Sequence, residues 1–97
     1  MNKKLSTRNV EQLFNAVLGL KDMQECYAFF EDICTPNEIL SFSQRFDVGV
    51  RLLKGQTYQE ICAGNGASSA TISRVSRLLS DDNDGIEMAV KRLKETE

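Results

Sequence analysis

The sequence predicts an all-α protein that forms a single domain over residues 1–97. Apolar residues recur three and four positions apart along almost the whole chain, which is the spacing of one helix face. Two segments that begin with threonine, TPNE at 35–38 and TYQE at 57–60, have the pattern of helix starts. No segment shows the convincing alternation of apolar and polar residues that predicts a half-buried strand. A chain of this length forms one modest core, which a second copy would enlarge.

Two amphipathic helices are expected within residues 6–34. The apolar face of the first consists of Val10, Leu13, Phe14, Val17 and Leu18. Gly19 is expected to bend or break this helix. The second helix has two apolar stripes, one of Met23, Tyr27, Phe30 and Cys34 and one of Cys26, Phe29 and Ile33. Because a helix that is apolar on two sides is buried from both, residues 6–34 are expected to form the core of a dimer.

The third and the last helix can also be placed from the sequence. Thr35 can cap the third helix, with Pro36 at its first position and Glu38 completing a capping box. Its expected apolar face is Ile39, Phe42, Phe46, Val50 and Leu53. Gly55 is well placed to end it in a left-handed conformation. The last helix is expected over residues 84–96, after an acidic turn, with an apolar face of Ile86, Ala89, Val90 and Leu93.

The segment GNGASSATISRV at residues 64–75 allows two interpretations, a loop that wraps a phosphate and the bend between two short helices. A dinucleotide-binding loop needs a buried strand followed by G-x-G-x-x-G. Here Ser69 replaces the third glycine, and the preceding residues 57–60 begin a helix instead. The Gly-Lys-Ser/Thr ending of a Walker loop is missing from the sequence as well. The bend is therefore favoured.

Residues 57–78 fit a helix-turn-helix motif better than an ordinary helical hairpin. The residues expected where the helices meet are apolar or small, namely Ile61, Cys62, Ala67, Ile72 and Val75. Gly66 supplies the turn, and Ser68 or Ser69 can cap the second helix. Asn65 departs from the pattern, because an apolar residue is common at that position in the turn. The outward set is short, polar and basic, and consists of Ser68, Ser69, Ala70, Thr71, Ser73, Arg74 and Arg77.

The residue types argue against the commonest catalytic and metal sites. The sequence has no histidine, so neither a Ser–His nor a Cys–His nucleophile pair can form within the chain. Its three cysteines, Cys26, Cys34 and Cys62, form no CxxC pair and are expected to be small buried hydrophobes in a reducing cytoplasm. No segment has the length and composition of a membrane span or a signal peptide. We therefore expect no catalytic residue, no metal, no cofactor and no membrane partner.

Charge is unevenly distributed along the chain. The net charge of −2 argues against a nucleic-acid partner, but residues 39–80 and 1–10 each carry +3, residues 11–38 carry −5, and residues 81–97 carry −3. Contact with phosphate depends on the charge of the local face rather than on the total. The basic block at 39–80 contains the helix-turn-helix motif, which favours a DNA partner. An ordinary mixture of solvated charges is the alternative.

From about residue 34 to residue 80 the chain resembles the Trp repressor family. The likeness runs from CTPNEILSFSQR to LLKGQTYQEICAGNGASSATISR and is carried by Thr-Pro-x-Glu, Leu-Leu-Lys-Gly and Ala-Thr-Ile-Ser-Arg in that order. Within the family, the chain looks most like the YerC-type members. The resemblance implies a six-helix, intertwined homodimer whose two recognition helices enter successive major grooves of double-stranded DNA. By position it implies DNA contacts from Ser68, Ser69, Ala70, Thr71 and Ser73 on the recognition helix, and from Tyr58, Gln59 and Cys62 on the helix before it.

The same resemblance implies an effector pocket that includes Thr35, Arg45, Arg74, Val75 and Leu78. Arg45 and Arg74 match the two guanidinium groups that hold tryptophan in the family. Val75 stands where the family has a glycine, and its side chain would intrude on a flat indole ring. Leu78 replaces a serine, which would leave the buried amino group of the ligand unpaired at a cost of roughly 1–3 kcal/mol. We therefore expect that tryptophan is not the effector. Alternatively, Arg45 and Arg74 only form ion pairs, with Glu38, Asp47 or Glu60 as partners.

The expected function is that of a cytoplasmic, homodimeric, sequence-specific DNA-binding regulator, which represses transcription and does not respond to tryptophan. Two alternatives stay open. One is a helical protein-interaction module that kept the fold but lost specific DNA binding, which the acidic total charge favours. The other is a regulator that responds to a different small carboxylate ligand. An enzyme is not expected.

Overall fold

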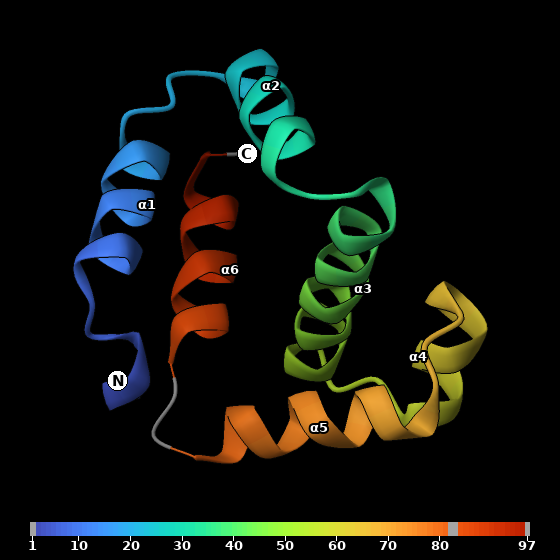
Figure 1. Cartoon of the computed structure of the whole chain (residues 1–97). Coiled ribbons are helices and arrows are strands. Elements are labelled where there is room, and N and C mark those ends of the chain that lie inside the picture. The colour runs from blue at the N-terminus through green and yellow to red at the C-terminus, as the bar shows by residue number, and fades with distance from the viewer. Residues whose placement is uncertain (1, 82–83, 97) are drawn as a thin grey trace. The chain divides into compact units, whose positions relative to one another are not determined.

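The computed structural model describes residues 2–81 and 84–96, which are almost entirely helical (Figure 1). A short 3-10 helix, η1, comes first, and six α-helices follow it in the described part of the chain. In chain order these are η1 (Lys3–Leu5), α1 (Arg8–Leu18), α2 (Met23–Ile33), α3 (Pro36–Leu53), α4 (Tyr58–Asn65), α5 (Ser69–Ser80) and α6 (Gly85–Thr96). No strand occurs within residues 2–81 and 84–96. The predicted all-α fold is confirmed.

The chain divides into two units, Met1–Pro36 and Asn37–Glu97. The first contains η1, α1 and α2. Helix α1 begins after Thr7, whose hydroxyl accepts a hydrogen bond from the backbone N–H of Val10 at 3.2 Å. It ends at Leu18, and Gly19 follows as its C-terminal cap, so the predicted break at Gly19 is confirmed. Helix α2 is capped in the same way by the carboxylate of Asp22.

Helices α1 and α2 leave their apolar faces open in the single chain. Neither helix has a buried residue. Leu18 is 82% exposed, Met23 72% and Tyr27 64%. The apolar stripes that the sequence indicates are therefore partly uncovered in one chain, since members such as Phe29 and Phe30 are half-buried. This is the arrangement expected of helices that another polypeptide covers.

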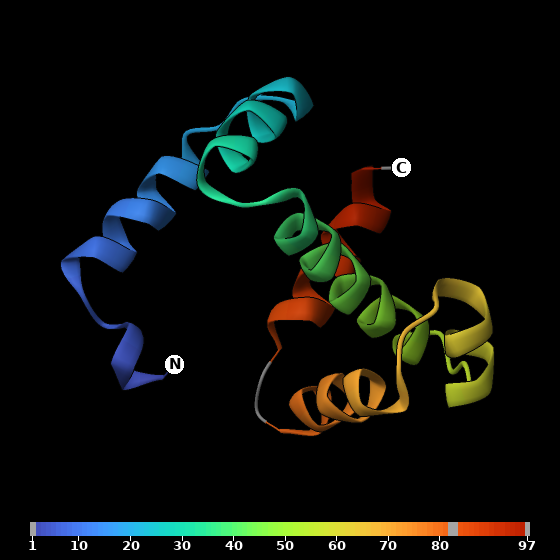
Figure 2. The same cartoon turned by 45° about the vertical axis from the view of Figure 1, so that its right-hand side comes forward.

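The second unit contains the buried core. Its members come from α3, α4, the following turn and α5, and they are Val48, Ile61, Ala67, Ile72 and Val75. Leu52, Leu79 and Ile86 pack at the edge of this cluster. In both views α4 and α5 meet at a steep angle beside the C-terminal end of α3 (Figures 1 and 2). The inward positions predicted for Ala67, Ile72 and Val75 are confirmed.

Burial of α3 in the single chain does not follow its predicted apolar face. Its most buried residues are Val48 and Gly49, which the prediction left out, whereas Phe42 is 48% exposed and Leu53 41% exposed. Gly49 lies so close to α6 that an added Cβ would come within 2.7 Å of Cγ2 of Ile86. The buried side of α3 thus includes a position without a side chain, and a pattern of apolar residues does not reveal it.

The predicted first residue and C-terminal end of α3 agree with the structure. Pro36 is its first residue, as expected. Gly55 follows the helix with φ +83°, so the predicted left-handed end is confirmed. The capping box of Thr35 and Glu38 stays a prediction.

The three cysteines are free thiols, and they differ in burial. Cys26 and Cys34 are half-buried, whereas Cys62 is exposed, so the expectation of a buried residue was wrong for Cys62. No helix in the described ranges is long and apolar enough to cross a membrane.

Candidate DNA-binding site

The site begins with a fully formed helix cap at the start of α4. The hydroxyl of Thr57 accepts the N–H of Glu60 at 3.2 Å, and the Glu60 carboxylate accepts the N–H of Thr57 at 3.1 Å. This is the capping box that the segment TYQE predicts. Ile61, one turn into the helix, is fully buried and anchors α4 on the core. The opposite side of α4 is left at the surface.

The turn between α4 and α5 is built on Gly66. This residue has φ +76° and ψ 7°, a left-handed conformation that costs a residue with a Cβ about 1–2 kcal/mol. Its N–H donates to the carbonyl of Cys62 at 2.8 Å, which closes the end of α4. Ala67 then enters the core, where it is fully buried. The predicted helix-turn-helix geometry is confirmed.

Asn65 explains why this turn can lack the usual apolar residue. Its side-chain oxygen accepts the N–H of Ala67 at 2.9 Å, and its side-chain nitrogen donates to the carboxylate of Asp47 at 3.0 Å. The half-buried amide therefore has a partner for both of its polar ends, which removes the desolvation cost of an unpaired group. The hydrogen bond from Asn65 to Asp47 on α3 thus replaces the apolar contact that is common at this position of a helix-turn-helix.

Asp47 is in turn held by Arg51 on the same helix. The guanidinium Nε of Arg51 lies 2.7 Å from Oδ2 of Asp47, and its terminal nitrogen donates to Gln56 at 3.3 Å. The hydrogen bond from Arg51 lowers the pKa of Asp47, against partial desolvation, and the hydrogen bond from Asn65 adds to the lowering. A Cβ at Gly64 would collide with the Arg51 guanidinium, so a larger residue at that position of α4 would displace the tip of the Arg51 side chain.

Sequence reasoning did not assign this polar network a role in the site. The i, i+4 spacing of Asp47 and Arg51 is a readable signal for an ion pair on one helix face. The contact with Asn65 has no such signal, because the two residues are 18 positions apart in sequence and meet only through packing of α4 on α3.

Helix α5 begins with Ser68 as its cap. The hydroxyl of Ser68 accepts the N–H of Thr71 at 3.2 Å and donates to the Thr71 hydroxyl at 3.1 Å. Of the two serines proposed as caps, Ser68 fills the role and Ser69 is the first helical residue. Of the residues that the resemblance places near DNA on this helix, Thr71 is half-buried, and the exposed ones are Ser68, Ser69, Ala70 and Ser73. The exposed side of α5 near its start therefore carries only short side chains.

Residues of α4 and the start of α5 come together at one exposed hollow. It has a volume of about 340 Å³ and is lined by Tyr58, Gln59, Cys62, Ala63 and Ser69. Cys62 thus faces outward, so its predicted place as the small residue between the two helices was wrong. Tyr58, Gln59 and Cys62 all lie on the surface side of α4, in line with the positions that the resemblance implies.

Tyr58 lies where the outward faces of the two helices come together. The nearby hydroxyls of Ser76 and Ser73, with a further contribution from the positive charge of Arg77, lower the pKa of the Tyr58 phenol. The side chain remains 41% exposed. Tyr58 is therefore a surface residue of α4 whose phenol lies near the hydroxyls of α5.

The residues of the expected effector pocket have different surroundings. Val75 is 2% exposed and belongs to the core, whereas Leu78 is 45% exposed. Arg74 is exposed on α5, and the guanidinium of Arg45 lies 4.9 Å from the centre of the Phe42 ring. Thr35 directly precedes α3. Asp47, one of the partners considered for Arg45 and Arg74, pairs with Arg51.

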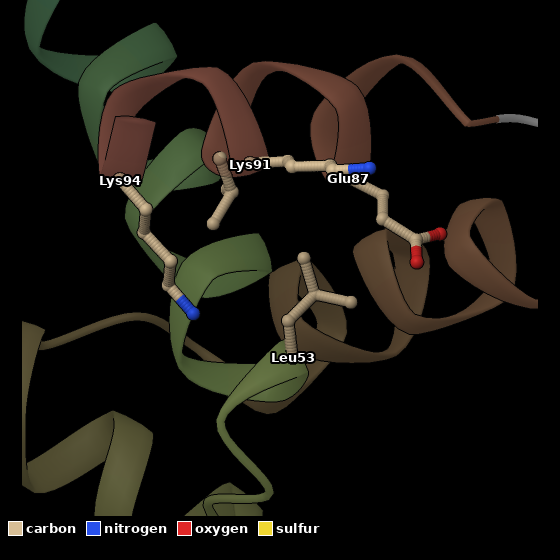
Figure 3. A pocket seen from close by; sticks show the side chains of 5 residues that line it. Leu53, Glu87, Lys91 and Lys94 are labelled. Carbon is tan, nitrogen blue, oxygen red and sulfur yellow. The ribbon is translucent and has the colours of Figure 1, made fainter. Parts of the chain in front are cut away.

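A second hollow lies elsewhere in the same unit, between the end of α3 and α6 (Figure 3). It has a volume of about 270 Å³ and is lined by Leu53, Glu87, Val90, Lys91 and Lys94. Leu53 extends from α3 into the space below α6, and the ammonium group of Lys94 lies at its rim. None of the residues predicted to contact DNA or an effector lines it.

Comparison with known proteins agrees with these features. The family model described as Trp repressor protein matches residues 8–94 of the chain. The uncharacterized protein YerC of Bacillus subtilis (strain 168) is 54% identical over 94 residues, which cover 97% of this chain and 90% of that protein. A solved TrpR-like protein from Eubacterium eligens ATCC 27750 is 56% identical, with a TM-score of 0.92 over 96% of each chain. A solved structure from Staphylococcus aureus is 46% identical, with a TM-score of 0.91 over 95% of this chain and 92% of that one.

Proposed function

The chain belongs to the Trp repressor family, and from this premise we propose that it is a sequence-specific DNA-binding regulator that represses transcription as a cytoplasmic homodimer. The observation that carries the proposal is the exposed surface formed by α4 and the first turn of α5, set on a buried core by two helix caps and a left-handed glycine. The family is a regulatory one, and we propose no enzymatic activity.

Helix α5 is the proposed recognition helix. Ser69, Ala70 and Ser73 are short and exposed, so the backbone of α5 can approach base edges closely. Serine hydroxyls can donate to or accept from bases and phosphates, and the N-terminus of a helix favours a phosphate through its free N–H groups. Arg74 and Arg77 are exposed further along the helix and add positive charge for the DNA backbone.

Helix α4 is proposed to contribute a second set of contacts. Gln59 and Cys62 lie beside Ser69 at the same hollow, so one stretch of DNA can meet both helices. The remaining proposed contacts are Tyr58 on α4, and Ser68 and Thr71 at the start of α5. Because Tyr58 and Cys62 are a phenol and a thiol where the family has polar or basic residues, the preferred DNA sequence is expected to differ from that of a tryptophan-sensing repressor.

The domain roles follow from the exposed apolar faces. We propose that residues 1–97 act as one functional domain, in which residues 6–34 form the dimer core, residues 57–78 the helix-turn-helix and residues 84–96 a C-terminal helix. The uncovered side chains of α1 and α2 support the first assignment. Two recognition helices of a dimer read half-sites about one DNA turn apart.

The proposal includes independence from tryptophan. Val75 is packed in the core of the chain, so its side chain occupies space next to the proposed pocket. Leu78 offers no hydrogen-bonding group for the amino group of an amino-acid ligand. We propose that the reading helices are held in place by the protein's own core, and that any small-molecule effector is a different carboxylate held by Arg45, Arg74 and Thr35.

The test is a selection of duplexes from a random-sequence DNA pool with the purified protein. The wild type should enrich a two-fold symmetric sequence. A plot of the logarithm of its binding constant against the logarithm of salt concentration should fall with a slope of roughly −0.9 for each phosphate that it contacts, which amounts to several units in total. Arg74→Ala combined with Ser69→Glu should abolish specific binding in a gel shift without unfolding the protein. Lys91→Ala combined with Arg92→Ala on α6 lowers the net charge equally and serves as the control. Unchanged affinity of the first variant would contradict the proposal.

A protein-interaction module that kept the fold is the second candidate function, and the net charge of −2 favours it. The same selection separates the two candidates. Such a module would enrich no sequence, and its weak retention on DNA would not fall steeply with salt.

A further inference from the structure

We infer that Asp47 is a positioning residue for DNA recognition, which holds the turn of the helix-turn-helix through Asn65. The inference rests on the proposed function and deepens it. Asp47 lies on α3, outside the motif, and no contact with DNA is assigned to it.

The geometry is a chain of hydrogen bonds from α3 to the start of α5. Oδ2 of Asp47 accepts from Nε of Arg51 at 2.7 Å and from Nδ2 of Asn65 at 3.0 Å. Oδ1 of Asn65 accepts the N–H of Ala67 at 2.9 Å, one residue before the cap Ser68. Asn65 is held from another side as well, because its carbonyl accepts from Nε2 of Gln44 at 3.2 Å. Both ends of the Asn65 side chain are thereby fixed.

Arg51 sets the position of the carboxylate. Its guanidinium donates hydrogen bonds to Asp47 and Gln56, and it lies against Gly64, where an added Cβ would displace it. The network therefore joins α3, the loop before α4, the last residues of α4 and the turn. These contacts define how α4 and α5 are placed relative to α3, and a shift of about 1 Å in such a supporting shell is enough to loosen a functional site.

Charge makes the inference sharply testable. Removal of an acidic side chain from a DNA-binding unit should, on electrostatic grounds alone, strengthen binding to DNA. The positioning role predicts the opposite sign for specific DNA. An amide oxygen at position 47 is a weaker acceptor than the carboxylate, so the hydrogen bond that orders Asn65 would be weakened. Asp47→Asn is therefore expected to weaken binding to the selected duplex while binding to a scrambled duplex stays equal or becomes tighter.

The experiment uses full-length variants and the duplex enriched by the wild type. Asp47→Asn should lower affinity for that duplex up to about tenfold, because weaker neutral hydrogen bonds replace the charge-assisted ones. Asn65→Asp places two carboxylates at hydrogen-bonding distance and should weaken binding further. The double variant D47N/N65D restores a donor and an acceptor at this contact and has the wild-type net charge, so it should recover most of the lost affinity. Glu87→Gln on α6 removes one acidic charge away from the turn and should bind like the wild type or more tightly.

Two further measurements separate positioning from general destabilisation. The melting temperature of each variant identifies loss of fold, and hydrogen exchange of the Ala67 N–H reports directly on its bond to Asn65. The inference is overturned if Asp47→Asn binds the selected duplex like the wild type, or if the double variant recovers no affinity beyond the single variants. A wild type that enriches no duplex would refute the proposed function, and the inference with it.

Discussion

At the scale of single residues, Val75 has the strongest bearing on which ligand the protein can sense. Val75 is 2% exposed and packs in one cluster with Ile61 and Ile72, so its side chain stabilises the core. The proposed independence from tryptophan assigns the same side chain a second role, that of taking up space which a flat ring would need. The same residue supports both the fold and the proposed ligand independence.

The first residue-scale prediction concerns tryptophan. A ligand that binds only the folded state raises the melting temperature by mass action. We expect Val75 to obstruct an indole ring and Leu78 to leave the amino group of the ligand without a partner. Millimolar tryptophan should therefore leave the melting temperature of the wild type unchanged. Differential scanning calorimetry with and without the ligand checks this, and glycine at the same concentration controls for general solvent effects. A clear rise with tryptophan alone would contradict the prediction.

A second residue-scale prediction concerns the pH dependence of stability through Asp47. Its pKa in the folded protein lies below the unfolded value, because Arg51 and Asn65 hydrogen-bond the carboxylate. Its contribution to stability is therefore fully present above the unfolded pKa of about 3.9, and is lost as pH falls through the folded value. The wild type should therefore have a larger free energy of unfolding than Asp47→Asn. This difference, the stability gap, should be constant from about pH 7 to pH 5 and should shrink below about pH 4.

Urea unfolding at a series of pH values measures this gap. The side chain of Asp47 is 42% exposed, so solvent screening keeps the effect small. Glu87→Gln is the control, since it removes an acidic group outside the network. A gap that widens at low pH would contradict the assignment of Asp47 as an ionised acceptor.

At the scale of elements, the helix-turn-helix could be predicted because its signals are local. The capping box of α4 and the turn at Gly66 depend on residues a few positions apart, and both are present as predicted. The left-handed conformation of Gly66 is an addition from the structure. The buried side of α3 could not be predicted, since its closest packing is at Gly49, where no side chain marks it. The contact of Asn65 with Asp47 is also invisible in the pattern, because it depends on how α4 packs on α3.

The element-scale prediction compares two glycines of the second unit. An added Cβ meets nothing within 4 Å at Gly66 or at Gly85, but Gly66 alone of the two has a positive φ, +76°. Gly66→Ala should therefore destabilise the protein by about 1–2 kcal/mol through backbone strain alone. Gly85→Ala, at the first position of α6, should be neutral or slightly stabilising.

Thermal and urea unfolding of both variants checks this comparison. The turn strain should also reduce specific DNA affinity for Gly66→Ala, since the start of α5 follows the turn directly. Equal stability of the two alanine variants would show that the left-handed turn is not what holds α4 and α5 in place.

At the scale of the whole molecule, the basic block of the sequence and the exposed apolar helices α1 and α2 lie in different segments. Residues 39–80 are basic and contain the proposed DNA-contacting helices, whereas residues 11–38 are acidic and contain most of α1 and all of α2. The helices α1 and α2 have no buried residue in the single chain. DNA binding and self-association are thus proposed for different segments, which allows each to be disrupted without the other.

The last prediction follows from that separation and concerns oligomeric state. Phe14 is 56% exposed and Leu18 is 82% exposed, one helical turn apart on α1. If this face belongs to the dimer core, Phe14→Lys combined with Leu18→Lys should convert a dimer into monomers at micromolar concentration, because two charges would be buried without partners. Gln12→Lys on the opposite side of α1 adds a like charge and should leave the dimer intact. Sedimentation equilibrium distinguishes these outcomes. A wild type that sediments as a monomer, or a double variant that remains a dimer, would contradict the role proposed for residues 6–34.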